Sequence, residues 1–459
     1  MRIAIIGAGG YTFPLRLIRD ALAFESTQDA TFALTDIDPV ALERTSRLAQ
    51  RMIDGHRLRA RVEASVDRRA MLRGADVVLV TFQVGGLDAY RHDVEIPRRY
   101  GVDQTVGDTL GPGGVFRGLR TGVVLEAIAS DMHELCPEAL LIQYANPMAI
   151  NCWLTADLGI RTVGLCHSVQ GTSRMLARIL GVEDRRWTFR CAGINHQAWF
   201  TRFSCDGVDV TAELRDAVNE FSRGDRYVPN ESDTLYGGGN ERVRTAIMNL
   251  TGYFHTESSH HASEYLPYFR RTPEEAQAFL PERWDYLQIN EEHDPAELER
   301  EAEDAAREPL QASEEYAAFI IDSLITDVPR VIHGNVRNDG LITNLPDGCC
   351  VEVPCLVNAN GIQPTHVGRL PAACAALNLG SIAVQSCAVA AAQEHSRELV
   401  HAAVALDPLT AAVMPLERIH AMVDEMLAAE AAWLPGFERP ANAARARPPR
   451  AAGAPVAPA

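Results

Sequence analysis

Met1-Arg2-Ile3-Ala4-Ile5-Ile6-Gly7-Ala8-Gly9-Gly10 is the stretch that decides the fold of this 459-residue chain. Its β-branched residues predict a strand over Arg2–Ile6, and the glycines stand where that strand would turn into a helix. Glycines at such a turn let the backbone approach a pyrophosphate, and the amides at the helix start can bind its charge. Gly7, Gly9 and Gly10 are therefore candidate cofactor-binding residues.

Asp36 follows the second predicted strand, Thr31–Thr35. An acidic residue at this position hydrogen-bonds the 2′-hydroxyl of a ribose and disfavours a 2′-phosphate, so we predict NAD rather than NADP. The third glycine of the usual fingerprint is replaced by Thr12. The same glycines and aspartate would also be found in a simple glycine turn with a helix-capping aspartate that binds no cofactor. The strand–helix–strand context favours cofactor binding.

Strands and helices alternate over residues 1–165, which predicts an α/β fold: a Rossmann-like, doubly wound parallel sheet that binds NAD. Residues 166–439 are more irregular and are expected to form a mixed α+β domain for substrate binding and oligomerisation. Residues 440–459 contain mainly Ala, Pro and Arg and are expected to be a disordered tail. The remaining predicted strands are Val77–Thr81, Leu140–Gln143 and Thr162–Leu165, and the predicted helices include Pro14–Phe24, Pro39–Asp54, Arg117–Leu135 and much of Leu370–Ala405.

Composition excludes several classes of protein. The formal charge of −18 argues against binding to nucleic acid or to an anionic membrane surface. The chain contains no lysine, which excludes Schiff-base, pyridoxal-phosphate and P-loop chemistry. We expect a cytoplasmic protein, since no signal-peptide pattern and no run of about 18 apolar residues is seen. The ten cysteines include no C-x-x-C pair and are expected to be thiols rather than disulfides.

Four segments place polar groups among glycines, prolines or apolar strand residues, and two of them follow predicted strands. In an open α/β sheet, ligands bind beyond the carboxyl ends of the strands. These segments therefore form the candidate active centre. They are Val106–Gly114 (VGDTLGPGG), Tyr144–Met148 (YANPM), Gly164–Val169 (GLCHSV) and Ala192–Gln197 (AGINHQ).

Together with the glycine fingerprint, this ordered set resembles glycoside hydrolase family 4, the NAD- and divalent-metal-dependent glycosidases. The resemblance runs from Met1 to about residue 430. Cys166-His167-Ser168-Val169 is similar to the α-galactosidase version of the family motif, as is the stretch Val353–Ile362. The resemblance implies a fold related to lactate and malate dehydrogenases, a small glycoside as substrate, and a homodimer or homotetramer.

The family chemistry does not use the pair of carboxylates found in most glycosidases. A hydride passes from sugar carbon 3 to NAD, which acidifies the proton on carbon 2; the aglycone then leaves, water adds and the hydride returns. The resemblance assigns a divalent metal, Mn²⁺ in the family, to Cys166 and His196. Mn²⁺ usually prefers oxygen ligands, so this assignment rests on resemblance rather than on ligand chemistry.

The other candidate site residues have more than one interpretation. By resemblance Tyr265 is the base at carbon 2 and Asn146 binds the substrate, with Asp108 as a rival base or an orienting group. His167 is a candidate acid, because imidazole titrates near neutrality. Arg91 could bind the sugar, although a surface arginine is equally compatible with the sequence.

The predicted function is therefore a redox-neutral α-galactosidase. An α-glucosidase, or an α-glucuronidase or galacturonidase, of the same family is the alternative within that mechanism. Two further alternatives do not use that mechanism. One is a net NAD-dependent oxidoreductase, which gives Cys166 and His196 no joint role, and the other is a non-catalytic NAD-binding sugar sensor.

Overall fold

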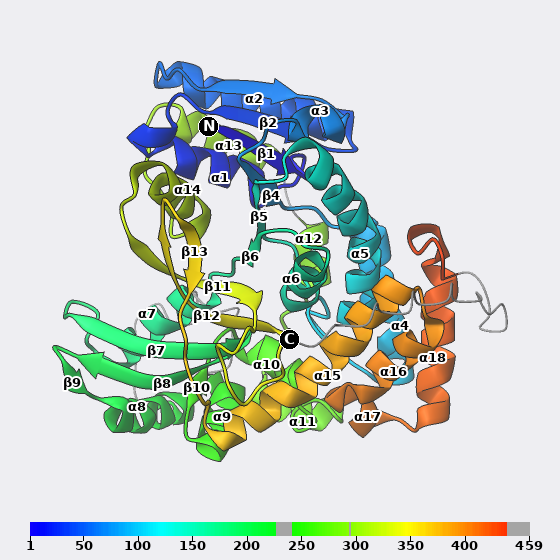
Figure 1. Cartoon of the computed structure of the whole chain (residues 1–459). Helices are drawn as coiled ribbons and strands as arrows, with labels where there is room; N and C mark the ends of the chain where they lie inside the picture. Colours follow the sequence, from blue (N-terminus) through cyan, green and yellow to red (C-terminus); the bar gives the residue numbers. More distant parts are fainter. Residues whose placement is uncertain (226–240, 293–294, 438–459) are drawn as a thin grey trace, which may run out of the picture.

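A computed structural model describes residues 1–225, 241–292 and 295–437 (Figure 1). The predicted tail, residues 440–459, lies outside the described residues. The described chain builds around one thirteen-stranded sheet. Its strands are β1 (Arg2–Ile6), β2 (Thr31–Thr35), β3 (Arg61–Ala64), β4 (Val77–Val80), β5 (Leu140–Gln143), β6 (Thr162–Gly164), β7 (Trp187–Ile194), β8 (Gln197–Cys205), β9 (Val208–Asp209), β10 (Phe254–His255), β11 (Arg330–Arg337), β12 (Cys350–Asn358) and β13 (Gly361–Pro364).

Helices cover the sheet and fill the space beside it. The α-helices are α1 (Pro14–Leu22), α2 (Pro39–Gly55), α3 (Arg68–Leu72), α4 (Gly86–Tyr100), α5 (Gly111–Leu135), α6 (Met148–Asp157), α7 (Ser168–Leu180), α8 (Thr211–Arg223), α9 (Arg242–Thr251), α10 (Ser259–Tyr265), α11 (Pro273–Phe279), α12 (Tyr286–Glu291), α13 (Pro295–Ala305), α14 (Tyr316–Thr326), α15 (Ala372–Glu394), α16 (Arg397–Leu406), α17 (Pro408–Val413) and α18 (Leu416–Ala429).

The sheet has a parallel half and an antiparallel half. The order β3-β2-β1-β4-β5-β6 is parallel throughout, as in a Rossmann fold, and confirms the predicted fold class. β11, β12, β7, β8 and β10 continue the sheet with antiparallel pairing, a continuation that was not predicted. Figure 1 shows the parallel strands in the upper part of the molecule and β7–β10 at the lower left.

Two pairings in the sheet are narrow: the one that joins the two halves and one within the antiparallel half. β6 pairs with β11 only through Gly164 and Asn335, and β12 pairs with β7 only through Glu352 and Gly193. Because Asn335 pairs with Glu352, Gly164 at the end of β6 and Gly193 near the end of β7 lie at the same level of the sheet. Cys166 follows the first of these strands and His196 follows the second.

The start of α5 differs from the prediction. The helix begins at Gly111 rather than near Arg117, because the Gly-rich segment is helical and not a loop. A Cβ at Gly113 would lie 2.3 Å from the carbonyl oxygen of Gly107, and one at Gly114 would lie 2.5 Å from the carbonyl carbon of Thr109. These glycines allow the first turn of α5 to press against the loop that carries Asp108.

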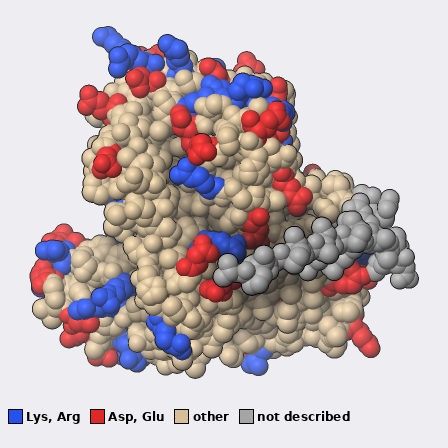
Figure 2. Space-filling view, viewed as in Figure 1, with Lys and Arg blue, Asp and Glu red and all other residues tan. Residues whose placement is uncertain are grey.

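α15 is the one helix of the described chain that is long and apolar enough to cross a membrane, with a mean hydropathy of 1.5. Asn378, Ser381 and Gln385 interrupt its apolar residues, so it contains no unbroken run of about 18 of them. It is half buried and packs against α5, α6 and α16, as core helices of the same composition do. Its path across the lower part of the molecule is seen in Figure 1, and Figure 2 shows acidic and basic side chains interspersed at the upper end of the same face of the molecule.

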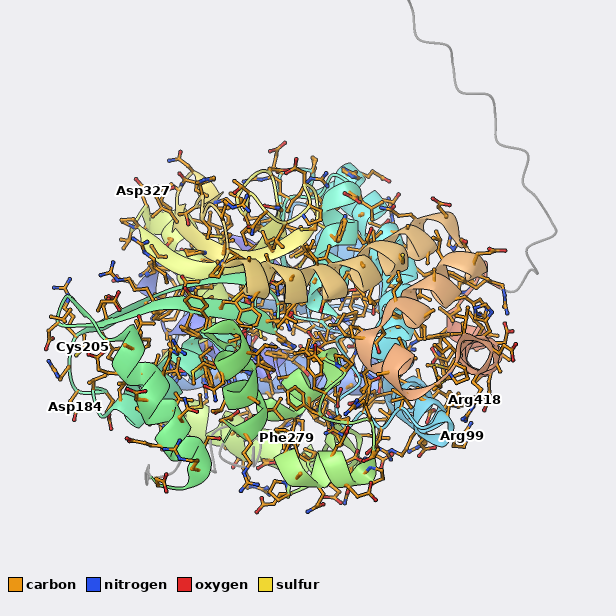
Figure 3. All side chains as sticks on the ribbon, turned by 90° about the horizontal axis from the view of Figure 1, so that it is seen from below. Arg99, Asp184, Cys205, Phe279, Asp327 and Arg418 are labelled. Carbon is orange, nitrogen blue, oxygen red and sulfur yellow. The ribbon has the colours of Figure 1, made fainter. Side chains whose placement is uncertain are left out.

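The C-terminal helices return to the helices of the parallel half. α18 packs against α4, and the Arg418 guanidinium donates to the carbonyl of Tyr100 over 3.3 Å. Figure 3 shows Arg418 beside Arg99 of α4 at this edge. Further inside, Arg120 of α5 forms fully buried ion pairs with Asp93 and Glu430. These contacts tie the end of the described chain to the Rossmann-like half.

Candidate active site

The turn between β7 and β8 carries His196 in a left-handed conformation, with φ at +64°. Such a φ is uncommon for a residue other than glycine and persists only when the surroundings fix it. Asn378 of α15 donates to both the backbone and the side-chain oxygens of Gln197, and the Trp199 indole donates to Asn378. α15 therefore anchors the turn that presents His196.

Cys166 and His196, separated by thirty residues of sequence, come together in space. The Cys166 sulfur lies 3.4 Å from Nε2 of His196. Glu257 completes the group, with a carboxylate oxygen 3.9 Å from the same nitrogen. The three ligand atoms lie within 4.8 Å of one another. A thiolate, an imidazole and a carboxylate are the donor types that divalent transition metals use in proteins.

The charges around these ligands also suit a cation. Burial and the charges of Glu257 and Glu352 raise the pKa of the Cys166 thiol well above its usual value. Burial would raise the pKa of Glu257 too, but the neighbouring imidazoles of His261, His196 and His167 hold it at about 2. The centre thus combines an anionic carboxylate with a thiol that needs a nearby positive charge to ionise.

Two buried polar groups orient His196. Its Nδ1 lies 3.1 Å from the Thr109 hydroxyl and 3.1 Å from the Tyr265 hydroxyl. The tautomer that leaves Nε2 free for a metal carries its proton on Nδ1 and donates it to one of these oxygens. Hydrogen bonding of this kind fixes the ring orientation and tautomer of metal-binding histidines.

Asp108 lies on the same side of the site and is 3 % exposed. Its carboxylate accepts from the Thr109 hydroxyl over 2.8 Å and from the Asn146 amide over 2.9 Å. Burial raises the pKa of Asp108, but the charges of Arg117, His261 and His196 outweigh this and lower it overall. Arg117 also donates to the backbone carbonyl of Asn146, so this unpredicted arginine supports both groups.

Tyr265, at the end of α10, is 2 % exposed. Burial and the negative charges of Asp108 and Glu257 raise its pKa well above the usual value for a phenol. Tyr265 reaches the site through its contact with His196 and is not one of the residues that line the pocket. The family resemblance named Tyr265 as the base, and the structure brings its hydroxyl to 3.1 Å from Nδ1 of His196.

A pocket opens over Cys166, His196 and Glu257, the candidate metal ligands. Trp284 and Tyr286 form one side of it, with their rings stacked at 5.2 Å and 14°. His261 of α10 lines the pocket and the adjacent His260 does not; its imidazole instead contacts the carbonyl of Glu282. The other lining residues are Phe13, Asp108, Tyr144, Asn146, Met148, Leu165, Cys166, His167, His196 and Glu257.

His167 and Arg91, the two remaining candidates, differ in position. The His167 side chain lines the pocket, is 52 % exposed and lies 3.8 Å from the buried carboxylate of Glu315. Arg91 does not line the described pocket; it is 44 % exposed and forms ion pairs with Glu291 and Asp88. The structure therefore brings His167 to the site and leaves Arg91 on the surface.

The glycine loop lies at the carboxyl end of β1. Gly7 has φ at +89°, and a Cβ there would lie 2.7 Å from backbone and side-chain atoms of Phe82. A Cβ on Gly9 would lie 2.7 Å from Ala41 and 2.9 Å from the Asp36 carboxylate, which accepts from the Gly9 amide. Just beyond, Ile37 is 99 % exposed. Closely packed glycines beside Asp36 and the exposed side chain of Ile37 agree with the predicted dinucleotide-binding loop.

Glu257, Arg117 and Trp284 were missed by sequence reasoning. Glu257 lies between β10 and α10 in a segment rich in polar residues, where no strand end marks it as a ligand. Arg117 lies inside α5, and Trp284 lies in a connection before α12. No predicted strand ends directly before any of these three residues. Glu257 and Trp284 line the pocket. Arg117 instead acts on it from behind through Asn146 and Asp108.

Two matches to known families cover most of the chain. Residues 2–182 match the model of the family 4 glycosyl hydrolases, and residues 191–410 match that of the family 4 glycosyl hydrolase C-terminal domain. The chain belongs to glycosyl hydrolase family 4. It is accordingly a glycoside hydrolase.

Relatives with curated functions resemble this family 4 hydrolase over nearly their whole length. An α-galactosidase of Rhizobium meliloti is 37 % identical, with 98 % of this chain and 92 % of the relative covered. An α-galactosidase of Bacillus subtilis is 36 % identical, covering 95 % of this chain and all of the relative. An α-galacturonidase of Bacillus subtilis is 30 % identical, covering 81 % and 84 %.

Solved structures show the same architecture. A protein described as a glucosidase, lplD, of Bacillus subtilis has a TM-score of 0.82 at 28 % identity, over 93 % of this chain and 99 % of its own. The 6-phospho-β-glucosidase of Thermotoga maritima, solved with manganese, NAD⁺ and glucose-6-phosphate, has a TM-score of 0.72 at 20 % identity, covering 94 % and 99 %. The latter likeness concerns the fold alone.

Proposed function

We propose that this family 4 hydrolase is an α-galactosidase that uses NAD and a divalent metal in a redox-neutral reaction. The observation that carries the proposal is the convergence of Cys166, His196 and Glu257 in a pocket that Asp108 and Asn146 also line. The two α-galactosidases at 36–37 % identity support the choice of sugar. Tyr265 and His167 complete the proposed site.

The charge of the pocket supports a neutral sugar. Among the described residues that line it, none is an arginine, and the chain contains no lysine. A uronic acid or a sugar phosphate brings an anion that needs a cationic partner when it leaves water. Here it would meet the carboxylates of Asp108 and Glu257, whose lowered pKa values already draw on the lining imidazoles of His196 and His261. This favours galactosides over galacturonides and 6-phosphosugars.

The residues present fit both cofactors. Cys166, His196 and Glu257 would hold the metal, and the proton on Nδ1 of His196 gives the tautomer that this requires. Gly7, Gly9 and Gly10 would receive the pyrophosphate of NAD, and Asp36 its adenosine ribose. When bound, NAD accepts and returns a hydride, and the metal polarises the sugar hydroxyls and withdraws electron density from the carbons that bear them.

The protein groups divide the proton transfers between them. Asp108 is a weak base, because its oxygens are occupied by Thr109 and Asn146 and its pKa is lowered, so we assign it the role of orienting Asn146 toward the substrate. We assign removal of the carbon 2 proton to Tyr265, which contacts the site through His196. The Nδ1 proton that His196 donates, together with a bound cation, would stabilise its phenolate against the burial that raises its pKa. His167, exposed at the pocket and beside Glu315, protonates the departing oxygen.

Hydrolysis of p-nitrophenyl α-galactoside by the purified protein tests the proposal. The assay is run with and without NAD⁺ and Mn²⁺, in the presence of a reductant that keeps Cys166 as a thiol. Nitrophenol should appear only with both cofactors, without accumulation of NADH, and deuterium at carbon 2 should exchange with solvent. The corresponding α-glucoside and α-galacturonide serve as matched substrates and should react at least tenfold more slowly.

Other outcomes identify the alternatives. Stoichiometric NADH would indicate a net oxidoreductase. NAD binding without either signal would indicate a sugar sensor. Faster hydrolysis of the galacturonide would overturn the argument from pocket charge while leaving the metal site intact.

A further inference from the structure

Glu264 is a buried carboxylate with no part in the chemistry above, yet it holds an unusual number of hydrogen bonds. It is 1 % exposed and directly precedes Tyr265 in α10. One of its oxygens accepts from the backbone amides of Thr105 and Val106 over 2.6 and 2.8 Å, and the other accepts from the amide of Gly107 over 2.9 Å. Three consecutive backbone amides therefore converge on one side chain.

Side chains of the same loop add to these contacts. The Thr105 hydroxyl and the Gln104 amide each donate to Glu264 over 3.3 Å. Arg270, also buried, donates to the carbonyl of Asp103 and to the Thr105 hydroxyl, over 2.9 and 3.0 Å. The loop of residues 103–109 is thus fastened to α10 and the segment that follows it.

We propose that Glu264 is a positioning residue that holds the loop carrying Asp108 in register with Tyr265. Glu264 is part of a closed ring of contacts. Its carboxylate accepts from the Gly107 amide, and Asp108 and Thr109 follow Gly107 in the chain. The Thr109 hydroxyl contacts His196, which in turn contacts the Tyr265 hydroxyl. Tyr265 is covalently joined to Glu264 and closes the ring. The inference rests on the proposed function, because it assigns Glu264 a role in the step at carbon 2.

The physical reason is that catalytic groups on separate elements lose rate steeply when misplaced, by about 10²-fold for a shift of about 1 Å. Glu264→Gln keeps the shape of the side chain but replaces one acceptor with an NH₂ group. That NH₂ would face the backbone amide of Gly107 or those of Thr105 and Val106. Both groups are hydrogen-bond donors, so no hydrogen bond can form between them. The loop then loses part of its fastening, and a buried donor is left without a partner.

Hydrogen–deuterium exchange tests the fastening independently of activity. The amides of residues 104–110 should exchange at least tenfold faster in Glu264→Gln than in the unchanged protein. Asp20→Asn is the matched control, since Asp20 is a buried carboxylate that accepts a backbone amide from distant Ser313. Asp20→Asn should leave exchange at residues 104–110 unchanged. Unaltered exchange in Glu264→Gln would overturn the proposal even if the protein proves not to be a galactosidase.

Kinetics with p-nitrophenyl α-galactoside test the role in the reaction. For Glu264→Gln we expect kcat to fall about 10- to 100-fold, with KM and the Kd for NAD within about threefold. The isotope effect of deuterium at carbon 2 should rise, whereas that at carbon 3 should not. A merely structural role would instead lower kcat and weaken NAD binding together, leaving the balance of the two isotope effects unchanged, and that result would overturn the proposal.

Glu264→Asp serves if the glutamine variant does not fold. Aspartate keeps the carboxylate, but its side chain is one methylene shorter, so the carboxylate lies farther from the loop amides. The kcat of this variant should lie between those of the unchanged protein and Glu264→Gln, with KM again nearly constant. A Glu264→Asp protein with unchanged kcat and unchanged amide exchange would contradict the inference.

Discussion

The two binding regions of this family 4 hydrolase are built in different ways. The proposed NAD cradle consists of backbone around Gly7–Gly10 that packs closely against neighbouring residues, with Ile37 beyond it fully exposed. The proposed metal centre consists of buried side chains from distant segments, with charges that influence one another. A site made of backbone needs close approach, whereas a site made of buried charges needs hydrogen bonds and compensating charge. The two regions should therefore fail independently and by different mechanisms.

Replacement of Cys166 should have the largest effect and should separate the two regions. Cys166→Ser removes the thiolate ligand, so we expect kcat to fall more than 10³-fold and Mn²⁺ binding to be lost, while the Kd for NAD stays within about twofold. Mn²⁺ binding measured by electron paramagnetic resonance and NAD binding measured by calorimetry check this. Cys136→Ser, at a buried thiol of the helix layer, is the control and should retain both. Loss of NAD binding in Cys166→Ser would show that the regions are coupled.

Gly9→Ala should produce the converse result. The added Cβ would lie within 2.9 Å of both Ala41 and the Asp36 carboxylate, which must shift and disturb the cradle. We expect the Kd for NAD to rise about 10- to 100-fold, with Mn²⁺ binding unchanged. Gly171→Ala is the control, because a Cβ at this helical glycine meets no atom within 4 Å. NAD binding by Gly9→Ala that matches the unchanged protein would contradict the proposed cradle.

Glu257→Gln tests whether the unpredicted carboxylate is a ligand. Glu257 is anionic throughout the working pH range, since its pKa is about 2, and glutamine removes that charge at nearly constant volume. Affinity for Mn²⁺ should fall about tenfold, which titration calorimetry on the NAD-free protein can measure. Glu352→Gln, at a buried carboxyl outside the ligand group, should change this affinity by less than threefold. Equal effects of the two variants would show that Glu257 acts only through the local field.

Glu352 should give the smallest effect, a change in how stability depends on pH. Burial raises its pKa to about 8 from the usual 4.5, so the folded protein keeps a proton that the unfolded chain releases. The free energy of unfolding should therefore fall as pH rises from about 5 to about 8. Glu352→Gln removes this contribution, and its Tm, measured by calorimetry on the metal-free protein, should decline less over that range. Parallel declines of Tm would contradict the assignment.

Most of the parallel half of the fold was predictable because its signals are local, although its edge strand β3 was not predicted. Predicted strands at Arg2–Ile6 and Leu140–Gln143 coincide with β1 and β5, since apolar strands between helices have a clear periodicity. β7, β8, β11 and β12 were not predicted, although Trp187–Cys205 and Cys350–Asn358 are strand-like in hindsight. Their pairing partners lie far away in sequence, and antiparallel continuation of a Rossmann sheet leaves no local mark.

The residues of the candidate site also differ in whether the sequence could predict them. Cys166 and Asn146 follow predicted strands, so their approach to the sheet edge could be inferred from the topology rule. Glu257 and Glu264 follow no such rule. Their importance depends on what lies opposite them, His196 in one case and the amides of Thr105–Gly107 in the other.

By itself the sequence predicted most of the Rossmann-like half, the proposed glycine cradle and the family, because strand periodicity, turn glycines and ordered motifs are properties of neighbouring residues. Only the tertiary structure decided that Glu257 joins Cys166 and His196, that Arg91 stays on the surface, and that Glu264 fastens the loop of Asp108 to α10. Hydrogen bonds and charge act over a few ångströms of space, and no spacing along the chain encodes which buried groups will meet there.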